Sequence, residues 1–234
     1  MNSANLTLEG ETLNARATGA LFWPAQSVLC VSDLHLGRTE RIAREGGHII
    51  PPYENTDTLQ RLEDEIRALA PATIICLGDS FDDLAATKSL TEIETDWITR
   101  LQAGCEWVWI EGNHDPAPLD LGGTHRETLR IGALTFRHIG DGQTTGEISG
   151  HFHPKATIPT RSRSVSRPCF LFDETRLIMP AFGTYTGGMK TSKPPLSTMF
   201  GKDAQVVLTG SSARRLNLHP SSKGARTPAS SRTG

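Results

Sequence analysis

The 234-residue chain lacks several features that mark special classes of protein. It has no CxxC pair, which argues against a thiolate zinc site or a redox motif. Most of its cysteines lie in or beside apolar runs, so we expect reduced thiols buried in strands. No apolar run approaches the roughly 18 residues of a membrane span, and no basic segment followed by an apolar stretch marks a signal peptide. We therefore expect a cytoplasmic protein. The four cysteines are Cys30, Cys76, Cys105 and Cys169.

The chain also has little net charge, because its 24 Lys and Arg residues nearly balance its 26 Asp and Glu residues. The field of the whole molecule therefore points to no class of partner, and any electrostatic argument must be local. The length suits one domain with its own core, expected over residues 1–210. Residues 211–234 are basic, rich in Ser, Pro and Gly, and predicted to be largely disordered.

Hydrophobic periodicity predicts an α/β protein. In the first half, buried strands alternate with helices, which is typical of a mostly parallel sheet. The second half contains short strands with little helix, which predicts a second sheet packed on the first. The expected helices are 39–45, 56–70 and 90–103, and the expected strands are 5–10, 19–24, 27–32, 72–78, 106–112, 127–138, 146–150, 167–173, 175–183 and 203–210.

Polar residues follow each buried strand of the first half, where the sequence reads Asp33-Leu-His35, then Gly-Asp79, then Gly-Asn113. In open α/β sheets, ligands bind at this carboxyl edge. The spacing of Asp33 and His35 predicts that both point the same way from an extended backbone, and His151 and His153 have the same spacing.

Carboxylate, imidazole and amide donors together indicate a site for manganese, iron or zinc ions. Each residue alone has an ordinary explanation, such as a helix cap, a turn or a packed histidine. Five of the eight histidines nevertheless fall within these motifs. The donors are too many for one tetrahedral zinc and suit two ions that share a carboxylate. The candidate ligands are Asp33, His35, Asp79, Asn113, His138, His151 and His153.

In this order, the DxH, GDxxD, GNHD, His and GHxH motifs of residues 33–153 resemble the motif series of the calcineurin-like metallophosphoesterases. The resemblance implies a four-layer αββα sandwich, with two facing β-sheets and a dinuclear metal site at the strand ends. It implies two divalent metal ions, with manganese expected first and iron or zinc as alternatives. One ion would take Asp33, His35, Asp79 and His153, and the other Asp79, Asn113, His138 and His151, with Asp79 bridging.

The same resemblance assigns catalytic roles to two further residues. His114 matches a residue that binds no metal and protonates the leaving oxygen, and Asp82 matches the carboxylate that orients this histidine. Because no position of the motif set is missing, an enzyme is favoured over a binding module that only uses the fold as a surface.

A narrower likeness covers nearly the whole chain. The stretches "VSDLHLGR", "GEISGHFHPKA", "RPCFLFD" and "LIMPAFGTYTGG" resemble the ligase-associated DNA damage response endonuclease group, PdeM. This resemblance implies a phosphodiesterase that acts on DNA in repair, linked to an ATP-dependent DNA ligase, a helicase and a 3′ exonuclease.

The substrate is less evident from the residues themselves. Residues 154–168 carry Lys155, Arg161, Arg163 and Arg167 and contain no acidic residue. This composition predicts a basic loop, which either follows a phosphate backbone or is only exposed to solvent. Few aromatics interleave with these charges, so base stacking is not evident. Arg38 is a further candidate for phosphate contact, and 182–188 is either a backbone-rich loop near the site or a plain turn. A small phosphoester, such as a nucleotide, stays the alternative substrate.

Overall fold

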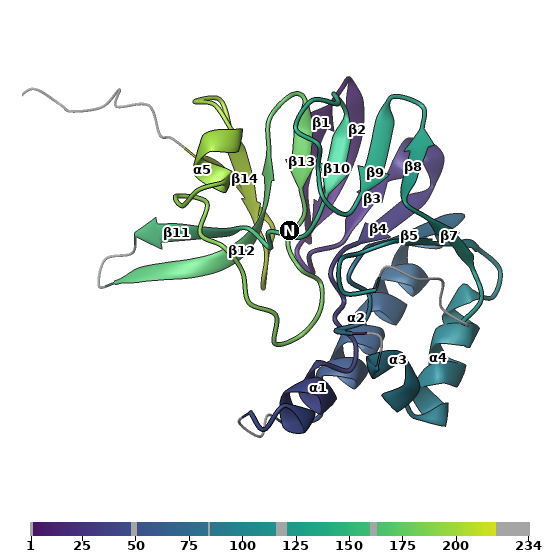
Figure 1. The fold of residues 1–234 in the computed structure, drawn as a ribbon. Coiled ribbons are helices and arrows are strands. Elements are labelled where there is room, and N and C mark those ends of the chain that lie inside the picture. The colour runs from purple at the N-terminus through teal and green to yellow at the C-terminus, as the bar shows by residue number, and fades with distance from the viewer. Residues whose placement is uncertain (1, 48–50, 84, 116–120, 160–162, 219–234) are drawn as a thin grey trace, which may run out of the picture.

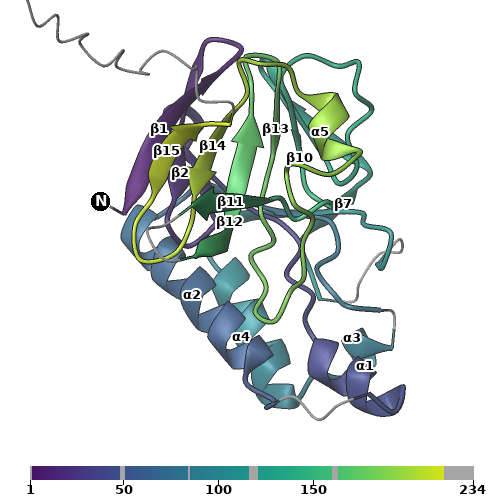
Figure 2. The same ribbon diagram turned by 90° about the vertical axis from the view of Figure 1, so that its left-hand side faces the viewer.

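Two β-sheets face each other at the centre of the fold (Figure 1). The structure is a computed structural model that describes all residues except 1, 48–50, 84, 116–120, 160–162 and 219–234. Helices cover the outer face of the first sheet, and a short helix with its flanking loops lies outside the second (Figure 2). The expected αββα sandwich is confirmed, with a thin outer layer on the second sheet.

The first sheet has seven strands in sequence order, β1 to β7. It is less parallel than the sequence predicts, because β1 to β4 pair antiparallel and only β4 to β7 run parallel. The tight turn at Glu9 and Gly10 explains the first antiparallel pair, since both residues have positive φ. The strands are β1 Ser3–Leu8, β2 Glu11–Arg16, β3 Leu21–Trp23, β4 Val28–Val31, β5 Thr73–Leu77, β6 Glu106–Ile110 and β7 Thr124–Arg126.

The second sheet has eight strands, seven of them in the order β15-β14-β12-β13-β10-β9-β8, with β11 paired to β12 outside this path. Strand β10 runs parallel to both β9 and β13, so β9 and β10 end at the same edge. The strands are β8 Thr128–Ile131, β9 Leu134–Arg137, β10 Glu147–Ser149, β11 Lys155–Pro159, β12 Ser164–Phe172, β13 Arg176–Ile178, β14 Gln205–Leu208 and β15 Arg214–Asn217.

The helices form close to the predicted positions, and their ends follow local chemistry. Helix α4 begins with a capping box, in which Thr91 Oγ1 accepts from Glu94 N and Glu94 Oε2 accepts from Thr91 N. Helix α2 ends at Leu69, and its C-cap residue Ala70 has a left-handed backbone just before Pro71. None of the described helices is long and apolar enough to cross a membrane. The helices are α1 Arg38–Arg44, α2 Glu54–Leu69, α3 Ala86–Ser89, α4 Glu92–Gln102 and α5 Leu196–Met199, with a 3₁₀ turn at Pro24–Gln26.

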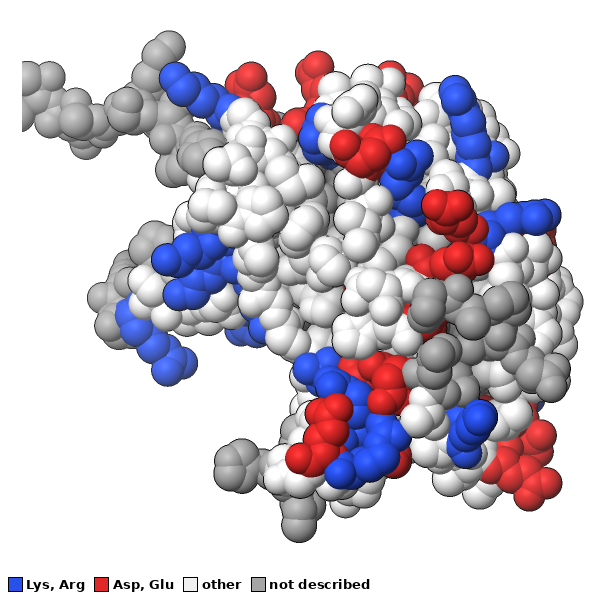
Figure 3. All heavy atoms as spheres, in the orientation of Figure 1, with Lys and Arg blue, Asp and Glu red and all other residues white. Residues whose placement is uncertain are grey.

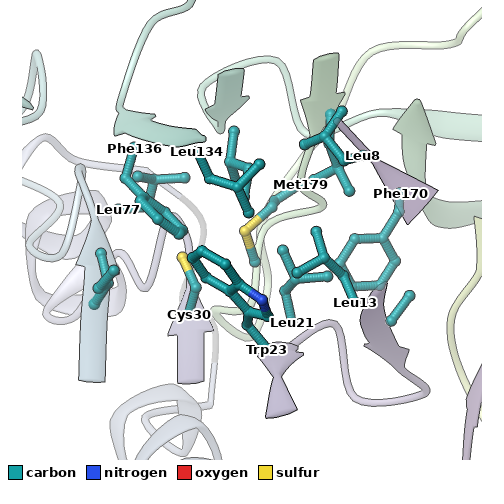
Figure 4. Packing of buried hydrophobic residues seen from close by; sticks show 14 of the residues in the cluster. Leu8, Leu13, Leu21, Trp23, Cys30, Leu77, Leu134, Phe136, Phe170 and Met179 are labelled. Atoms are coloured by element: carbon teal, nitrogen blue, oxygen red, sulfur yellow. The ribbon is translucent and has the colours of Figure 1, made fainter. Parts of the chain in front are cut away.

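The main core lies between the two sheets (Figure 4). Leu13 and Trp23 of the first sheet pack in one cluster with Phe136 and Phe170 of the second. A second cluster joins the other face of the first sheet to α2 and α4, and a third joins β12 and β14 to α5. Each fully buried large side chain contributes about 1.5–3 kcal/mol, so the two inner faces hold the sheets together.

The cysteines are free thiols in the structure, as expected. Cys30, Cys76 and Cys169 are buried, and Cys105 is half-buried beside the end of α4. Burial raises the pKa of the Cys169 thiol to about 12, so it stays protonated at neutral pH.

Two expectations about irregular segments are wrong. The basic stretch expected as a loop is mostly a β-hairpin, in which β11 and β12 pair antiparallel from Lys155↔Pro168 to Pro159↔Ser164. The domain does not end at residue 210, because β15 pairs with β14 beyond it. Arg215 ties β15 to the first sheet by donating to the Asn5 carbonyl at 2.9 Å. The expected disorder of the later tail lies outside the described residues.

We therefore expect a chain that ends at Leu218 to melt at the same temperature as the full chain. A chain that ends at Gly210 should melt at a clearly lower temperature, because it leaves the β14 edge unpaired and removes the Arg215 contacts. Calorimetry of the two truncated chains tests the new boundary, and equal melting temperatures would restore residue 210 as the end of the domain.

Candidate metal centre

The predicted ligands meet because strand ends of both sheets meet. Strands β4, β5 and β6 are parallel neighbours, so the residues after them lie at one edge of the first sheet. Strands β9 and β10 are parallel neighbours in the second sheet and end facing that edge. The ligands follow these strands as Asp33 and His35 after β4, Asp79 after β5, Asn113 after β6, His138 after β9, and His151 and His153 after β10.

The backbone at these ligands is not extended, which corrects the reason given for their spacing. Asp33, His35, Asp79, His151 and His153 all have φ between 45° and 67°, in the left-handed region. Such a backbone costs about 1–3 kcal/mol per residue and persists only where surrounding structure enforces it. Successive side chains are therefore aimed by tight turns, and strain of this kind is concentrated at functional sites.

One cluster consists of Asp33, His35 and His153, with potential ligand atoms within 4.8 Å of one another. His153 Nε2 lies 3.0 Å from Asp33 Oδ1, and the rings of His35 and His153 meet edge to face at 5.3 Å. Within the described part of the chain, the buried His35 Nε2 has no hydrogen-bond partner. An orphaned imidazole nitrogen beside a carboxylate fits a bound metal ion.

A second cluster consists of Asp79, His138 and His151, and Asn113 joins it. His138 Nε2 lies 3.0 Å from Asn113 Oδ1 and 3.2 Å from Asp79 Oδ2. His138 Nδ1 lies 3.1 Å from the Leu77 carbonyl, which can only accept, so Nδ1 carries the hydrogen and Nε2 is left for a metal. Asn113 Oδ1, Asp79 Oδ2 and His138 Nε2 are therefore close enough together to bind one cation.

The two clusters are adjacent. The backbone N–H of His151, in the second cluster, donates to Asp33 of the first at 3.1 Å from Oδ2. The structure groups Asp79 with the second cluster, so its bridging position stays a prediction.

Close approach of the chain segments requires glycine at several positions beside the ligands, among them Gly150. A Cβ on Gly150 would lie 2.0 Å from Ser32 Oγ and 2.5 Å from Asp33 Oδ2. The missing side chain lets the strand that carries His151 lie against the carboxylate of Asp33.

The charges of the second cluster are strongly coupled. Burial alone would lower the pKa of His138, but the carboxylates of Asp79 and Asp33 outweigh it and raise the value to about 9. Burial would likewise raise the pKa of Asp79, but His138 and the His114 backbone N–H lower it to about 2. In the metal-free protein, a protonated His138 therefore takes the place of a metal ion among these oxygens.

Asp82 was expected to orient His114 through its carboxylate, and in the structure its backbone carbonyl makes the contact, 2.7 Å from His114 Nδ1. A carboxylate oxygen of Asp82 also lies within 4.8 Å of ring nitrogens of His35 and His114, which form a third group of possible ligands. The buried carboxylate faces His35, with Oδ1 2.8 Å from His35 Nδ1 at an angle outside the usual hydrogen-bond range. Arg38 donates to Oδ1 at 3.0 Å and Arg41 to Oδ2 at 2.5 Å.

These contacts bear on the expected roles of Asp82 and Arg38. Burial would raise the pKa of Asp82, but His35, Arg41 and Arg38 lower it to about 2, so it stays ionised. The negative charge of Asp82 beside His35 Nδ1 favours the tautomer that carries its hydrogen on Nδ1 and leaves Nε2 for a metal ion. Arg38, expected to contact phosphate, is bonded to this carboxylate in the structure.

Three supporting residues were not predicted. Ser32 donates to Asp33 Oδ2 at 2.5 Å, and Arg41 holds Asp82. The buried Asp115 accepts from the backbone N–H groups of Ser80 at 2.7 Å and Gly112 at 3.1 Å, so it joins the loops after β5 and β6. The GNHD motif contains Asp115 and could have indicated it, whereas no sequence signal marks the other two.

The basic candidates on the β11–β12 hairpin divide between its two faces. Lys155 and Arg167 lie on opposite faces, because Arg167 pairs with the buried Ala156. Arg163 is exposed, just before β12, and Arg161 lies outside the described residues. The Lys and Arg atoms over the projecting hairpin have no Asp or Glu beside them on the face in Figure 3.

Comparison with protein families then identifies the fold. The sequence model of the calcineurin-like phosphoesterases matches residues 27–169, which include every predicted metal ligand. The chain belongs to this family. It is a metal-dependent phosphoesterase, and its two clusters are the candidate sites for the divalent ions that the family implies.

Solved structures extend the comparison. A nuclease of Pseudomonas putida, MPE, is 27% identical with a TM-score of 0.71, over 92% of this chain and all of that one. The E. coli phosphoesterase Yfce is 10% identical over 82% of this chain and 99% of that one, with a TM-score of 0.39. A search of curated proteins found no match. The nuclease is consistent with the narrower PdeM resemblance.

We predict that metal binding by this phosphoesterase releases a proton at neutral pH. His138 has a pKa of about 9 in the metal-free protein, and an ion needs the unprotonated imidazole, so metal affinity should rise with pH until about pH 9. Calorimetry of manganese binding in buffers with different ionisation enthalpies measures the proton directly.

The same pKa has a consequence for metal-free stability. Because the folded value lies above 6.5, the ion pair stabilises the fold below that pH and is lost as the pH rises through about 9. A His138→Gln variant should lose this dependence, and a metal-free melting temperature that stays flat over the interval in both proteins would contradict it.

We also predict that Asp82→Asn weakens manganese binding by about 10–100-fold, because the charge behind His35 is lost. Asp83→Asn is the matched control, since Asp83 is the next residue and contacts Arg44 at the surface. Metal titration with elemental analysis gives affinity and stoichiometry without any assay of turnover. Unchanged affinity with reduced turnover would instead return Asp82 to the role of orienting His114.

Proposed function

We propose that this phosphoesterase is a nuclease that hydrolyses phosphodiester bonds of DNA. The observation that carries the proposal is the likeness to the P. putida nuclease, with a TM-score of 0.71 over 92% of the chain. Intact metal clusters support catalysis, since all seven predicted ligands lie at the shared edge of the two sheets.

Divalent ions held at the two clusters would supply a nucleophile at neutral pH and neutralise charge on the phosphoryl oxygens, and we propose manganese first. His114 then acts on the leaving group. Its Nδ1 donates to the Asp82 carbonyl, because a carbonyl only accepts, so Nε2 is the nitrogen that can hold a transferable proton. Donation of that proton to the departing oxygen is typically worth about 10²–10⁴-fold in rate.

The basic hairpin supports a polymeric substrate. Lys155 comes two residues after the ligand His153, and Arg163 and Arg167 follow farther along the hairpin, with Arg167 on the face opposite Lys155. A protein that neutralises several DNA phosphates binds with a steep dependence on salt. A small phosphoester would require no such surface.

The biological setting follows from the narrower resemblance. Likeness to the ligase-associated endonuclease group supports a role in DNA repair, with an ATP-dependent DNA ligase and a helicase as functional partners.

The proposal is tested with metal-stripped protein reloaded with manganese. We expect it to hydrolyse bis-p-nitrophenyl phosphate and to cleave a nicked or flapped DNA, with only the DNA reaction falling steeply as salt rises. Turnover of the ester with inert DNA would reject the nuclease and favour a small phosphoester.

We predict that His114→Ala retains both metal ions but loses about 10²–10⁴-fold in DNA cleavage. The loss should be much smaller with an ester that has a good leaving group, such as p-nitrophenolate, because that group departs without a proton. Kinetics on activated and unactivated esters, with elemental analysis of bound metal, check the role. Equal loss on both esters would contradict it.

A further inference from the structure

The segment after β13 is fastened at both ends to backbone carbonyls of metal ligands. Gly183 N–H donates to the Asp33 carbonyl at 3.1 Å, and Met189 N–H donates to the His153 carbonyl at 3.1 Å. Asp33 and His153 belong to one metal cluster, so residues 184–188 bridge the backbone on either side of it. We call residues 183–189 the bridging loop.

The fit at both ends is too close for any side chain. A Cβ on Gly183 would lie 2.0 Å from the Leu34 carbonyl, and one on Gly188 would lie 2.3 Å from the His153 carbonyl. Gly188 also has a φ of 156°. The bridging loop therefore lies directly against the ligand turns.

Helix α2 holds the first half of the bridging loop. Arg61 donates to the Phe182 carbonyl and to Thr184 Oγ1, each at 2.8 Å, and its guanidinium stacks on the Phe182 ring at 4.6 Å. Thr184 N–H donates to Thr58 Oγ1 at 3.1 Å. These contacts bury polar groups of Thr184 against the protein and leave the next residue at the exposed point of the loop.

That next residue is Tyr185. Its φ of 61° is unusual for a bulky residue, its side chain is 43% exposed, and nothing in the described part of the chain hydrogen-bonds to its hydroxyl. A strained, exposed aromatic adds little to a core. An exposed aromatic ring on a loop that contacts the ligand backbone is available to stack on part of a substrate.

Two lysines lie at the other end of the bridging loop. Lys155 and Lys190 form a parallel bridge, and Lys155 N–H donates to the Met189 carbonyl at 2.7 Å. The Lys155 side chain runs past Gly188, with Cε 2.8 Å from where a Cβ would stand there. Among the described residues, neither lysine forms a salt bridge. Their charges are therefore available to an anion.

Figures 1 and 2 show where this segment lies. The green chain between β13 and α5 descends from the second sheet between the β11–β12 hairpin and α1. We propose that the bridging loop forms a nucleotide subsite next to the metal centre. Tyr185 stacks on the nucleobase that flanks the scissile phosphate, and Lys155 with Lys190 binds the adjacent phosphate. The inference rests on the proposed nuclease and names the residues through which it holds its substrate.

The test compares two esters with the same leaving group, thymidine 5′-(p-nitrophenyl phosphate) and methyl p-nitrophenyl phosphate, which has no base. Tyr185→Ala should raise KM for the thymidine ester about tenfold more than for the methyl ester, because stacking on one base is lost. Tyr185→Phe should behave as wild type. Ile93→Ala, which removes another exposed apolar side chain on α4, is the control.

Binding and stability give readouts besides turnover. Lys155→Ala and Lys190→Ala should each reduce the salt dependence of oligonucleotide binding by about one phosphate contact, measured by fluorescence anisotropy. Tyr185→Gly should raise the melting temperature, because glycine tolerates the left-handed backbone, while the thymidine ester is still bound more weakly.

The outcomes separate two kinds of failure. Equal effects of Tyr185→Ala on both esters, or none on either, would overturn the subsite. A wild-type enzyme that prefers the thymidine ester but leaves DNA intact would overturn the proposed DNA activity alone.

Discussion

The left-handed backbone after β4, β5 and β10 is the constraint on which the metal centre depends. Five ligands have φ near 50°, and none would hold that conformation in an isolated peptide. Packing between the two sheets holds these turns in the left-handed conformation, because each strained turn follows a strand buried in that core. Part of the free energy gained by packing the two sheets therefore offsets the cost of the strained backbone at the ligands.

A second set of interactions surrounds the ligands and sets their protonation. Asp82 lies behind His35 and is itself held by Arg38 and Arg41, so helix α1 is linked to the metal cluster. The Leu77 carbonyl fixes the tautomer of His138 and the Asp82 carbonyl that of His114. Backbone oxygens are well suited to this task, because they cannot titrate.

The proposed substrate surface combines segments that are far apart in the chain. The hairpin contributes Lys155, the bridging loop contributes Tyr185, and Lys190 follows the end of that loop, which is bonded to the His153 carbonyl. Residues 154–168 contain no aromatic residue that could stack on a base, and Tyr185 of the bridging loop would take that role in the proposed subsite. The proposed subsite would give a chain of nearly neutral net charge a local cationic surface for a phosphate polymer.

Sequence patterns were sufficient for the alternation of strands and helices and for choosing seven candidate metal ligands that the fold brings together. They succeed because buried strands are apolar throughout and because catalytic motifs stand directly after them. They could not reveal the left-handed turns, since φ at Asp or His leaves no mark in composition. They paired the Asp82 carboxylate with His114 but did not indicate its contact with His35, because that contact joins residues 47 positions apart. Hairpin β11–β12 and strand β15 were missed, since edge strands with exposed polar residues resemble loops. Which side chains face one another across these turns is a property of packing, and only the folded chain settles it.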